Sequence, residues 1–162
     1  MEHSLFLARP QASIHIISWY INTVKTKIEK DNVLPLLPLL ANFNVVGLNE
    51  FKTKCHISVS GYFSLVSQKS AHPHHSFTCV LVKDRLEPYV TSVGVSVPHQ
   101  VWFELKCVPD TLLGFCYILS PDSPYFSFVP LGTIQEKIKT SNCNRCVLLS
   151  DFNAHCGAWV AC

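Results

Sequence analysis

The chain has 162 residues, of which 48% are hydrophobic and 15% charged, and its formal net charge is +2. This length suits one domain with a substantial buried core. A net charge this close to zero is compatible with a polyanionic partner but does not indicate one. No apolar run approaches the roughly 18 residues that a membrane-spanning helix needs, so the sequence argues against a membrane protein.

The N-terminal part of the chain predicts a leader, a strand and a helix. Residues 1–12 show no periodicity, and we expect them to form a loose leader before one domain over residues 13–162. Residues 13–21 are β-branched and aromatic, which predicts a strand. A helix should follow over residues 24–33, because two prolines just beyond this stretch break helices.

A second buried strand is predicted over residues 43–48, and it ends on the polar residues Asn49 and Glu50. Two parallel strands joined by a helix place both carboxyl ends on the same edge of a sheet. If the first two strands are parallel, Glu50 therefore lies near Asn22, the polar residue that follows the first strand.

The middle of the chain changes to short strands separated by Pro, Gly, Asp and Ser residues, without helices. This spacing of about 8 to 12 residues predicts an antiparallel sheet. The five strands expected are residues 61–66, 77–82, 89–95, 101–107 and 112–119. A helix should follow over residues 131–139, because Leu131, Ile134 and Ile138 recur at helical spacing. That helix leads into a last apolar strand over residues 146–149.

The last strand stops at a polar cluster that contains Asp151 and Asn153. In an open α/β sheet, ligands bind at the carboxyl ends of the strands. With one residue between them, these two side chains share one side of an extended chain. A carboxylate and a carboxamide can together hold a water and a phosphate oxygen. Mg²⁺ takes one or two carboxylates with waters and phosphate oxygens, so Glu50 could anchor one.

The chain contains eight cysteines, and we expect free thiols and no disulfide-linked partner. The N-terminus lacks the features of a signal peptide, so we expect an intracellular protein of the nucleus or cytoplasm, where thiols stay reduced. Cys143 and Cys146, with His155 and Cys156, give four possible zinc ligands, but their spacing fits no zinc module. Four cysteines in apolar stretches are expected to be buried: Cys79, Cys107, Cys116 and Cys146.

A series of short motifs runs along the chain. It comprises residues 18–22 (Ser-Trp-Tyr-Ile-Asn), 47–50 (Gly-Leu-Asn-Glu), 61–62 (Gly-Tyr), 80–83 (Val-Leu-Val-Lys), 113–118 (Leu-Gly-Phe-Cys-Tyr-Ile) and 149–154 (Leu-Ser-Asp-Phe-Asn-Ala). Their order and rough spacing resemble the endonuclease/exonuclease/phosphatase superfamily, most closely the endonuclease domain of LINE-type, non-LTR retrotransposons. The resemblance covers about residues 14–157. It implies an α/β fold that is a four-layer sandwich, and Mg²⁺-dependent nicking of DNA.

The resemblance also implies roles for individual residues. Glu50 matches the metal-binding glutamate, and Asn22 matches an asparagine of the first motif that helps to bind the metal. Asp151 matches the aspartate that orients or activates the attacking water. Asn153 matches its phosphate-contacting partner, and Tyr117 matches the tyrosine that supports the transition state.

The chain departs from the family at several positions. Tyr20 stands where the family has a metal-binding asparagine, and a phenol with a pKa near 10 is a poor Mg²⁺ ligand at neutral pH. Thr23 replaces a glycine, and Ser150 replaces another. The family's C-terminal Ser-Asp-His motif, which carries the catalytic histidine, does not occur, and His155 does not match its position. We therefore expect a sandwich that is incomplete at its C-terminal end.

Three hypotheses for function follow. The first is a truncated DNA endonuclease domain of retrotransposon origin, dependent on Mg²⁺ or Mn²⁺ and impaired in activity. The alternative is a catalytically inactive, degenerate domain, or a module that binds nucleic acid or protein. A third keeps the fold but acts on a phosphorylated lipid or small molecule. Dependence of DNA nicking on Glu50 and Asp151 separates the first hypothesis from the second.

Overall fold

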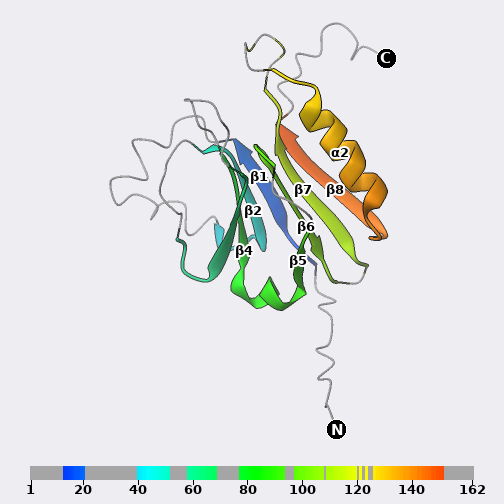
Figure 1. The fold of residues 1–162 in the computed structure, drawn as a ribbon. Coiled ribbons are helices and arrows are strands. Elements are labelled where there is room, and N and C mark those ends of the chain that lie inside the picture. Colours follow the sequence, from blue (N-terminus) through cyan, green and yellow to red (C-terminus); the bar gives the residue numbers. More distant parts are fainter. Residues whose placement is uncertain are drawn as a thin grey trace, which may run out of the picture.

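The computed structural model describes residues 13–20, 40–51, 58–68, 77–93, 97–107, 109–119, 121, 123 and 126–151. These residues form a mixed α/β structure with two four-stranded sheets. Figure 1 shows the two sheets packed face to face, with a helix on the outer face of the second sheet. The leader predicted over residues 1–12 and the helix predicted over residues 24–33 lie outside the described residues.

The strands divide evenly between the two sheets. The first sheet has the order β1-β2-β4-β3 and consists of β1 (Ile16–Tyr20), β2 (Val45–Phe51), β3 (Tyr62–Val66) and β4 (Phe77–Lys83). The second has the order β5-β6-β7-β8 and consists of β5 (Val90–Ser92), β6 (Gln100–Leu105), β7 (Thr111–Tyr117) and β8 (Arg145–Asp151). The 3₁₀ helix η2 (Asp84–Tyr89) joins β4 to β5, and the helix α2 (Val129–Thr140) precedes β8.

The pairing of the strands meets one condition set in the sequence analysis and corrects one prediction. β1 and β2 are parallel, which is the arrangement under which Glu50 was expected near Asn22, and β7 and β8 form a second parallel pair. The short strands in the middle are antiparallel, but the prediction of one antiparallel sheet was wrong, because β3 and β4 belong to the first sheet while β5, β6 and β7 belong to the second. The chain passes from the first sheet to the second through η2, whose Leu86 is buried in the core.

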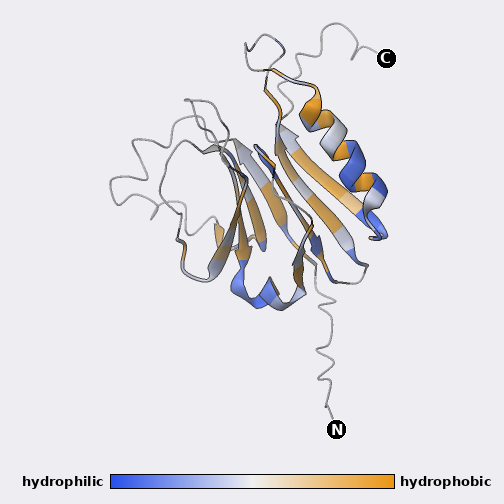
Figure 2. Ribbon diagram, viewed as in Figure 1, coloured by the Kyte–Doolittle hydropathy of each residue, from blue (hydrophilic) through white to orange (hydrophobic). Residues whose placement is uncertain are grey.

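The main core lies between the two sheets. The rings of Phe103 and Phe115 stack there with centroids 6.2 Å apart and an interplanar angle of 6°, and both side chains are fully buried. Gly47 in β2 faces this pair, since a Cβ added at that position would overlap the ring of Phe115. Figure 2 shows that the strands are largely hydrophobic, whereas η2 is hydrophilic. Burial of these apolar inner faces against each other supplies the main driving force for folding.

Helix α2 covers the outer face of the second sheet. Its one buried residue, Ile134, packs with Trp102, Leu112 and Cys116. The helix begins at Val129, two residues before the predicted start, because Pro130 stands in its first turn, where a missing N–H costs nothing. No helix among the described residues is long and apolar enough to cross a membrane.

The described cysteines are free thiols. Cys79, Cys107 and Cys116 are buried, as predicted, and burial raises the pKa of both Cys79 and Cys116 to about 12. The prediction that Cys146 is buried was wrong, because β8 lies at the edge of its sheet and Cys146 is exposed. The described residues contain no cluster of three or more His, Cys, Asp or Glu side chains that could hold a metal ion.

Candidate functional site

Four strands end at one edge of the paired sheets. β1 and β2 run in parallel up to the pair Tyr20 and Asn49, and β7 and β8 run in parallel up to the pair Tyr117 and Asp151. In Figure 1 the arrowheads of β1, β7 and β8 point toward the same edge. We call this edge, formed by the carboxyl ends of β1, β2, β7 and β8, the carboxyl edge.

A chain of hydrogen bonds between buried and partly buried groups ties the two sheets together at the carboxyl edge. Asn49 Nδ2 donates to Ser18 Oγ at 3.0 Å, which links β2 to β1. Thr78 Oγ1 lies 3.3 Å from Asn49 Oδ1 and 3.0 Å from the carbonyl oxygen of His99, so its hydroxyl links β4 to the start of β6. The same carbonyl accepts the backbone N–H of Tyr117 at 2.9 Å. The end of β2 is therefore held at a fixed position relative to the end of β7.

These contacts matter because Asn49 and Thr78 are almost completely buried, with exposed fractions of 1% and 0%. A polar group in an apolar interior costs free energy unless it forms hydrogen bonds, and a satisfied network fixes one arrangement of its members. Sequence reasoning missed this network. The signal was present in Thr78, a hydroxyl residue inside an otherwise apolar strand, and in Asn49, which was assigned to a strand end rather than to the interior.

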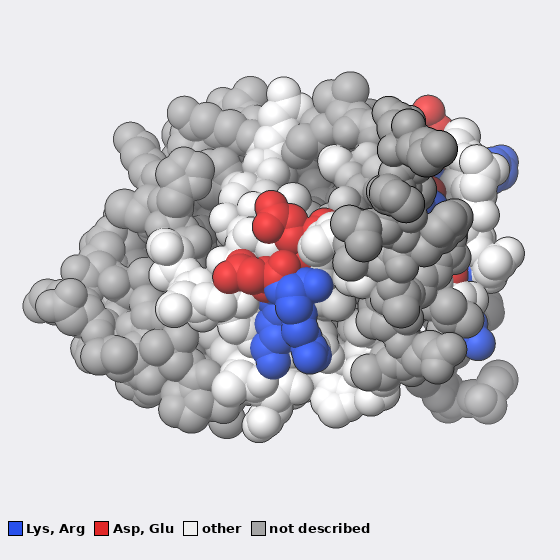
Figure 3. Space-filling view, turned by 90° about the horizontal axis from the view of Figure 1, so that it is seen from below, with Lys and Arg blue, Asp and Glu red and all other residues white. Residues whose placement is uncertain are grey.

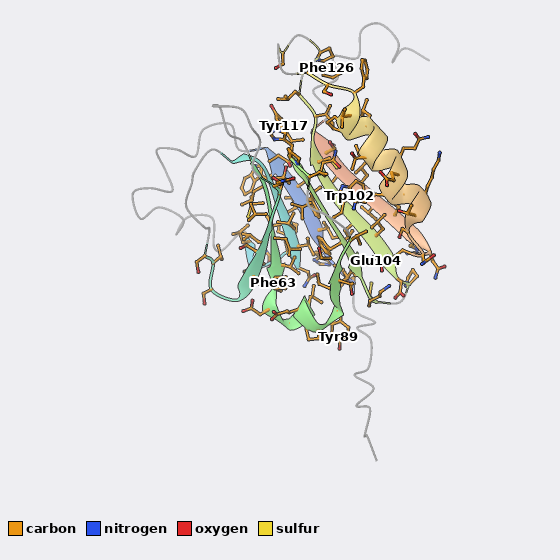
Figure 4. All side chains as sticks on the ribbon, in the orientation of Figure 1. Phe63, Tyr89, Trp102, Glu104, Tyr117 and Phe126 are labelled. Atoms are coloured by element: carbon orange, nitrogen blue, oxygen red, sulfur yellow. The ribbon has the colours of Figure 1, made fainter. Side chains whose placement is uncertain are left out.

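Tyr117 is the last residue of β7 and lies at the carboxyl edge. Only 6% of the residue is exposed, and its ring meets the ring of His99 edge-on, with centroids 6.0 Å apart and an interplanar angle of 66°. Figure 4 shows Tyr117 at the end of β7, far from Glu104 and Tyr89 at the other end of the sheets. His99 has a φ of 61°, a left-handed conformation that histidine adopts more readily than most residues. This turn positions the His99 ring against Tyr117.

A pocket of about 210 Å³ opens beside Tyr117. Its wall also includes His99, Gln100 and the first turn of α2, where Pro130 lies. Gln100 is fixed in this wall because its Nε2 donates to the carbonyl oxygen of Pro130 at 2.9 Å, and its Oε1 accepts the indole N–H of Trp102 at 2.9 Å. The pocket is smaller than the usual 300 to 1,000 Å³ or so of a drug-sized ligand site, so it suits a small group.

The structure locates three of the five predicted site residues. Glu50 is part of β2 and directly follows Asn49, and Asp151 is the last residue of β8, where its Cα is the register partner of Tyr117. The strands thus bring Glu50, Tyr117 and Asp151 to the carboxyl edge. Asn22 and Asn153, the other two predicted residues, lie outside the described residues. So does His155.

Charged side chains cluster at the opposite end of the second sheet. Lys106 Nζ lies 2.6 Å from Glu104 Oε2 and 3.7 Å from Asp110 Oδ2. The hydrogen bond from Lys106 lowers the pKa of Glu104, and the same bond raises the pKa of Lys106. Figure 3, which views the molecule from the end opposite the carboxyl edge, shows acidic and basic side chains side by side. The described part of that face therefore has no basic stripe that would bind a polyanion.

Comparison of the chain with protein-family models and with curated proteins found no match.

Proposed function

We propose that the chain is a phosphodiester hydrolase that nicks DNA with the help of Mg²⁺ or Mn²⁺, built as a four-layer α/β sandwich of retrotransposon origin. The observation that carries this proposal is the register of β7 and β8, which makes Tyr117 and Asp151 direct neighbours at the carboxyl edge. β2, which contains Glu50, ends at the same edge. A DNA substrate implies action in the nucleus or the cytoplasm, where the free thiols of the chain would stay reduced.

The donor set at the carboxyl edge suits Mg²⁺. Mg²⁺ binds through one or two carboxylates and keeps several waters or phosphate oxygens, so it does not need a large cluster of acidic side chains. Glu50 and Asp151 are the two carboxylates of the strands that end there. Glu50, with Asn22, would hold the ion. When bound, the ion polarises the phosphate and stabilises the charge on the leaving oxygen.

The residues of the chain then have distinct tasks. Asp151 accepts a hydrogen bond from the attacking water and takes its proton. Tyr117 donates its hydroxyl hydrogen to a phosphate oxygen on which negative charge develops, and its nearly complete burial strengthens that interaction by excluding water. Asn153 orients the phosphate through its amide. The network through Asn49 and Thr78 keeps β2 and β7 in place, so these groups need not rearrange during the reaction.

The test is nicking of supercoiled plasmid with Mg²⁺ by the wild type and three variants, Glu50→Gln, Asp151→Asn and Tyr117→Phe. Loss of a general base lowers the rate by about 10² to 10⁴, and loss of one donor to the developing charge by about 10² to 10³. We expect the nicking rate to fall by these factors in the Asp151 and Tyr117 variants. In the Glu50 variant, we expect Mg²⁺ no longer to stimulate nicking. The control is Glu136→Gln on the exposed side of α2, which should nick like the wild type.

The alternative is a domain that binds nucleic acid or protein without catalysis. Tyr20 in place of a metal-binding asparagine is the feature that favours it. In that case the wild type, shown to be folded by circular dichroism, nicks no faster than the three variants. Binding of a labelled duplex that is unchanged by Asp151→Asn would support this alternative and contradict the hydrolase.

A further inference from the structure

β8 is an edge strand with an exposed apolar side chain, that of Val147. It pairs with β7 on one side, and the described part of the chain places no strand on its other side. Val147 is 38% exposed, whereas its register partner in β7, Leu113, is fully buried. An exposed apolar strand at the edge of a sheet presents unpaired N–H and C=O groups to any further strand.

The charges of β8 identify which strand would fit there. Arg145 begins the strand and Asp151 ends it, and the five residues between them are uncharged. Arg145 and Asp151 lie at equal distances from the central residue, Leu148, and carry opposite charges. A strand of this kind complements itself only when the second copy runs antiparallel, because a parallel copy in register would place like charges opposite each other.

The geometry points to a homodimer in which β8 of one chain pairs antiparallel with β8 of a second copy, about a two-fold axis at Leu148. Such an interface uses the same surface on both subunits and closes on itself. The opposing residues are Leu148 with Leu148, Val147 with Leu149, Cys146 with Ser150, and Arg145 with Asp151, each of the last three pairs occurring twice. The two sheets that contain β8 then join into one continuous eight-stranded sheet.

The other edge strands of the described sheets lack this complementarity. β1 (Ile-Ile-Ser-Trp-Tyr) and β3 (Tyr-Phe-Ser-Leu-Val) carry no charge, and β5 has only three residues. The surface available along seven residues of β8 is small, so we expect a weak dimer whose population rises with concentration. In the dimer the two Asp151 positions lie at opposite ends of the paired strands, about 20 Å apart at roughly 3.4 Å per residue.

Sedimentation velocity over about a hundredfold range of concentration tests this interface. We expect the wild type to shift from monomer to dimer. Arg145→Asp and Asp151→Arg each replace both opposite-charge pairs by like-charge pairs, and each should weaken the homodimer by roughly tenfold. An equimolar mixture of the two variants should dimerise like the wild type, because the heterodimer again sets opposite charges across both pairs.

The matched controls are Lys139→Asp and Glu136→Arg, which make the same changes of charge on the exposed side of α2. Neither should alter the wild-type dimer. Val147→Lys places a charge in the middle of the interface at a half-exposed position, so it should leave a folded monomer by circular dichroism. A wild type that stays monomeric, or that forms open-ended aggregates, would overturn the proposal. So would a mixture of the two β8 variants that fails to dimerise.

Discussion

Replacement of Gly47 by alanine tests how the two sheets pack. Gly47 lies inside β2, in register with Ser18 of β1 and Val80 of β4, so its backbone is held on both sides. A Cβ at this position would overlap the ring of Phe115 in the opposite sheet. That ring cannot withdraw easily, because it is fully buried and stacks on Phe103.

The size of the effect follows from two opposing contributions. Overfilling a packed core costs about 1 to 3 kcal/mol, and the contact with Phe115 is severe enough to place Gly47→Ala near the upper end. Alanine also reduces the conformational entropy of the unfolded chain, which stabilises the folded protein by about 0.4 to 1 kcal/mol. The net loss in the free energy of unfolding is therefore about 2 kcal/mol. For a chain of this length, that lowers the Tm by about 4 to 8 °C.

Gly132→Ala is the matched control, since it makes the same chemical change in α2. A Cβ there would meet no atom within 4 Å, and alanine is favoured over glycine in a helix by about 1 kcal/mol. We expect its Tm to rise by about 2 to 4 °C in the same thermal scans. If Gly47→Ala unfolded at or above the temperature of the wild type, the face-to-face packing at Phe115 would be wrong.

Three further predictions concern buried and charged groups. Thr78→Val keeps the shape of the side chain but removes the hydrogen bonds of its hydroxyl to Asn49 and to the carbonyl oxygen of His99. It should lower the free energy of unfolding, measured in urea, by about 1 to 3 kcal/mol, and Thr78→Ser should lower it less. Among the described thiols, Cys146 should be alkylated first in the native protein and Cys116, with a pKa of about 12, only after unfolding, as peptide mapping would show. The pKa of Glu104 is lowered in the folded chain, so its contribution to stability is complete above the unfolded pKa of about 4.3 and is lost as the pH falls through the folded pKa. Glu104→Gln should therefore reduce the loss of stability on acidification below about pH 4.3. An unchanged dependence of stability on pH would contradict the lowered pKa.

Local sequence patterns were sufficient to predict most of the strands. β4, β7 and β8 are runs of apolar or β-branched residues bounded by turn residues, so their positions follow from composition, and α2 follows from the helical spacing that ends at Ile138. The division into two sheets could not be predicted in this way. It depends on which strands become neighbours, which is decided by contacts between segments far apart in the sequence, such as those in the core cluster that contains Leu86.

The candidate site shows the same limit. Motif order alone proposed Tyr117, Glu50 and Asp151 as site residues, and only the strand register shows that Asp151 lies beside Tyr117. The network through Asn49 and Thr78 was not predictable from sequence, because each residue contacts a partner in another strand and burial, rather than residue type, makes the contacts important. Likewise, the exposure of Cys146 follows from the place of β8 at the edge of its sheet, which the apolar sequence of β8 does not reveal.

The most direct test of the proposed function is a double-mutant cycle in the plasmid assay, with Tyr117→Phe, Asp151→Asn and the double variant, each checked for folding. If both residues act on one phosphate at the carboxyl edge, their effects are strongly non-additive, and the double variant nicks about as slowly as Asp151→Asn alone. Wild-type protein that shows no Mg²⁺-dependent nicking above the double variant would contradict the hydrolase. So would single variants that both retain the full wild-type rate.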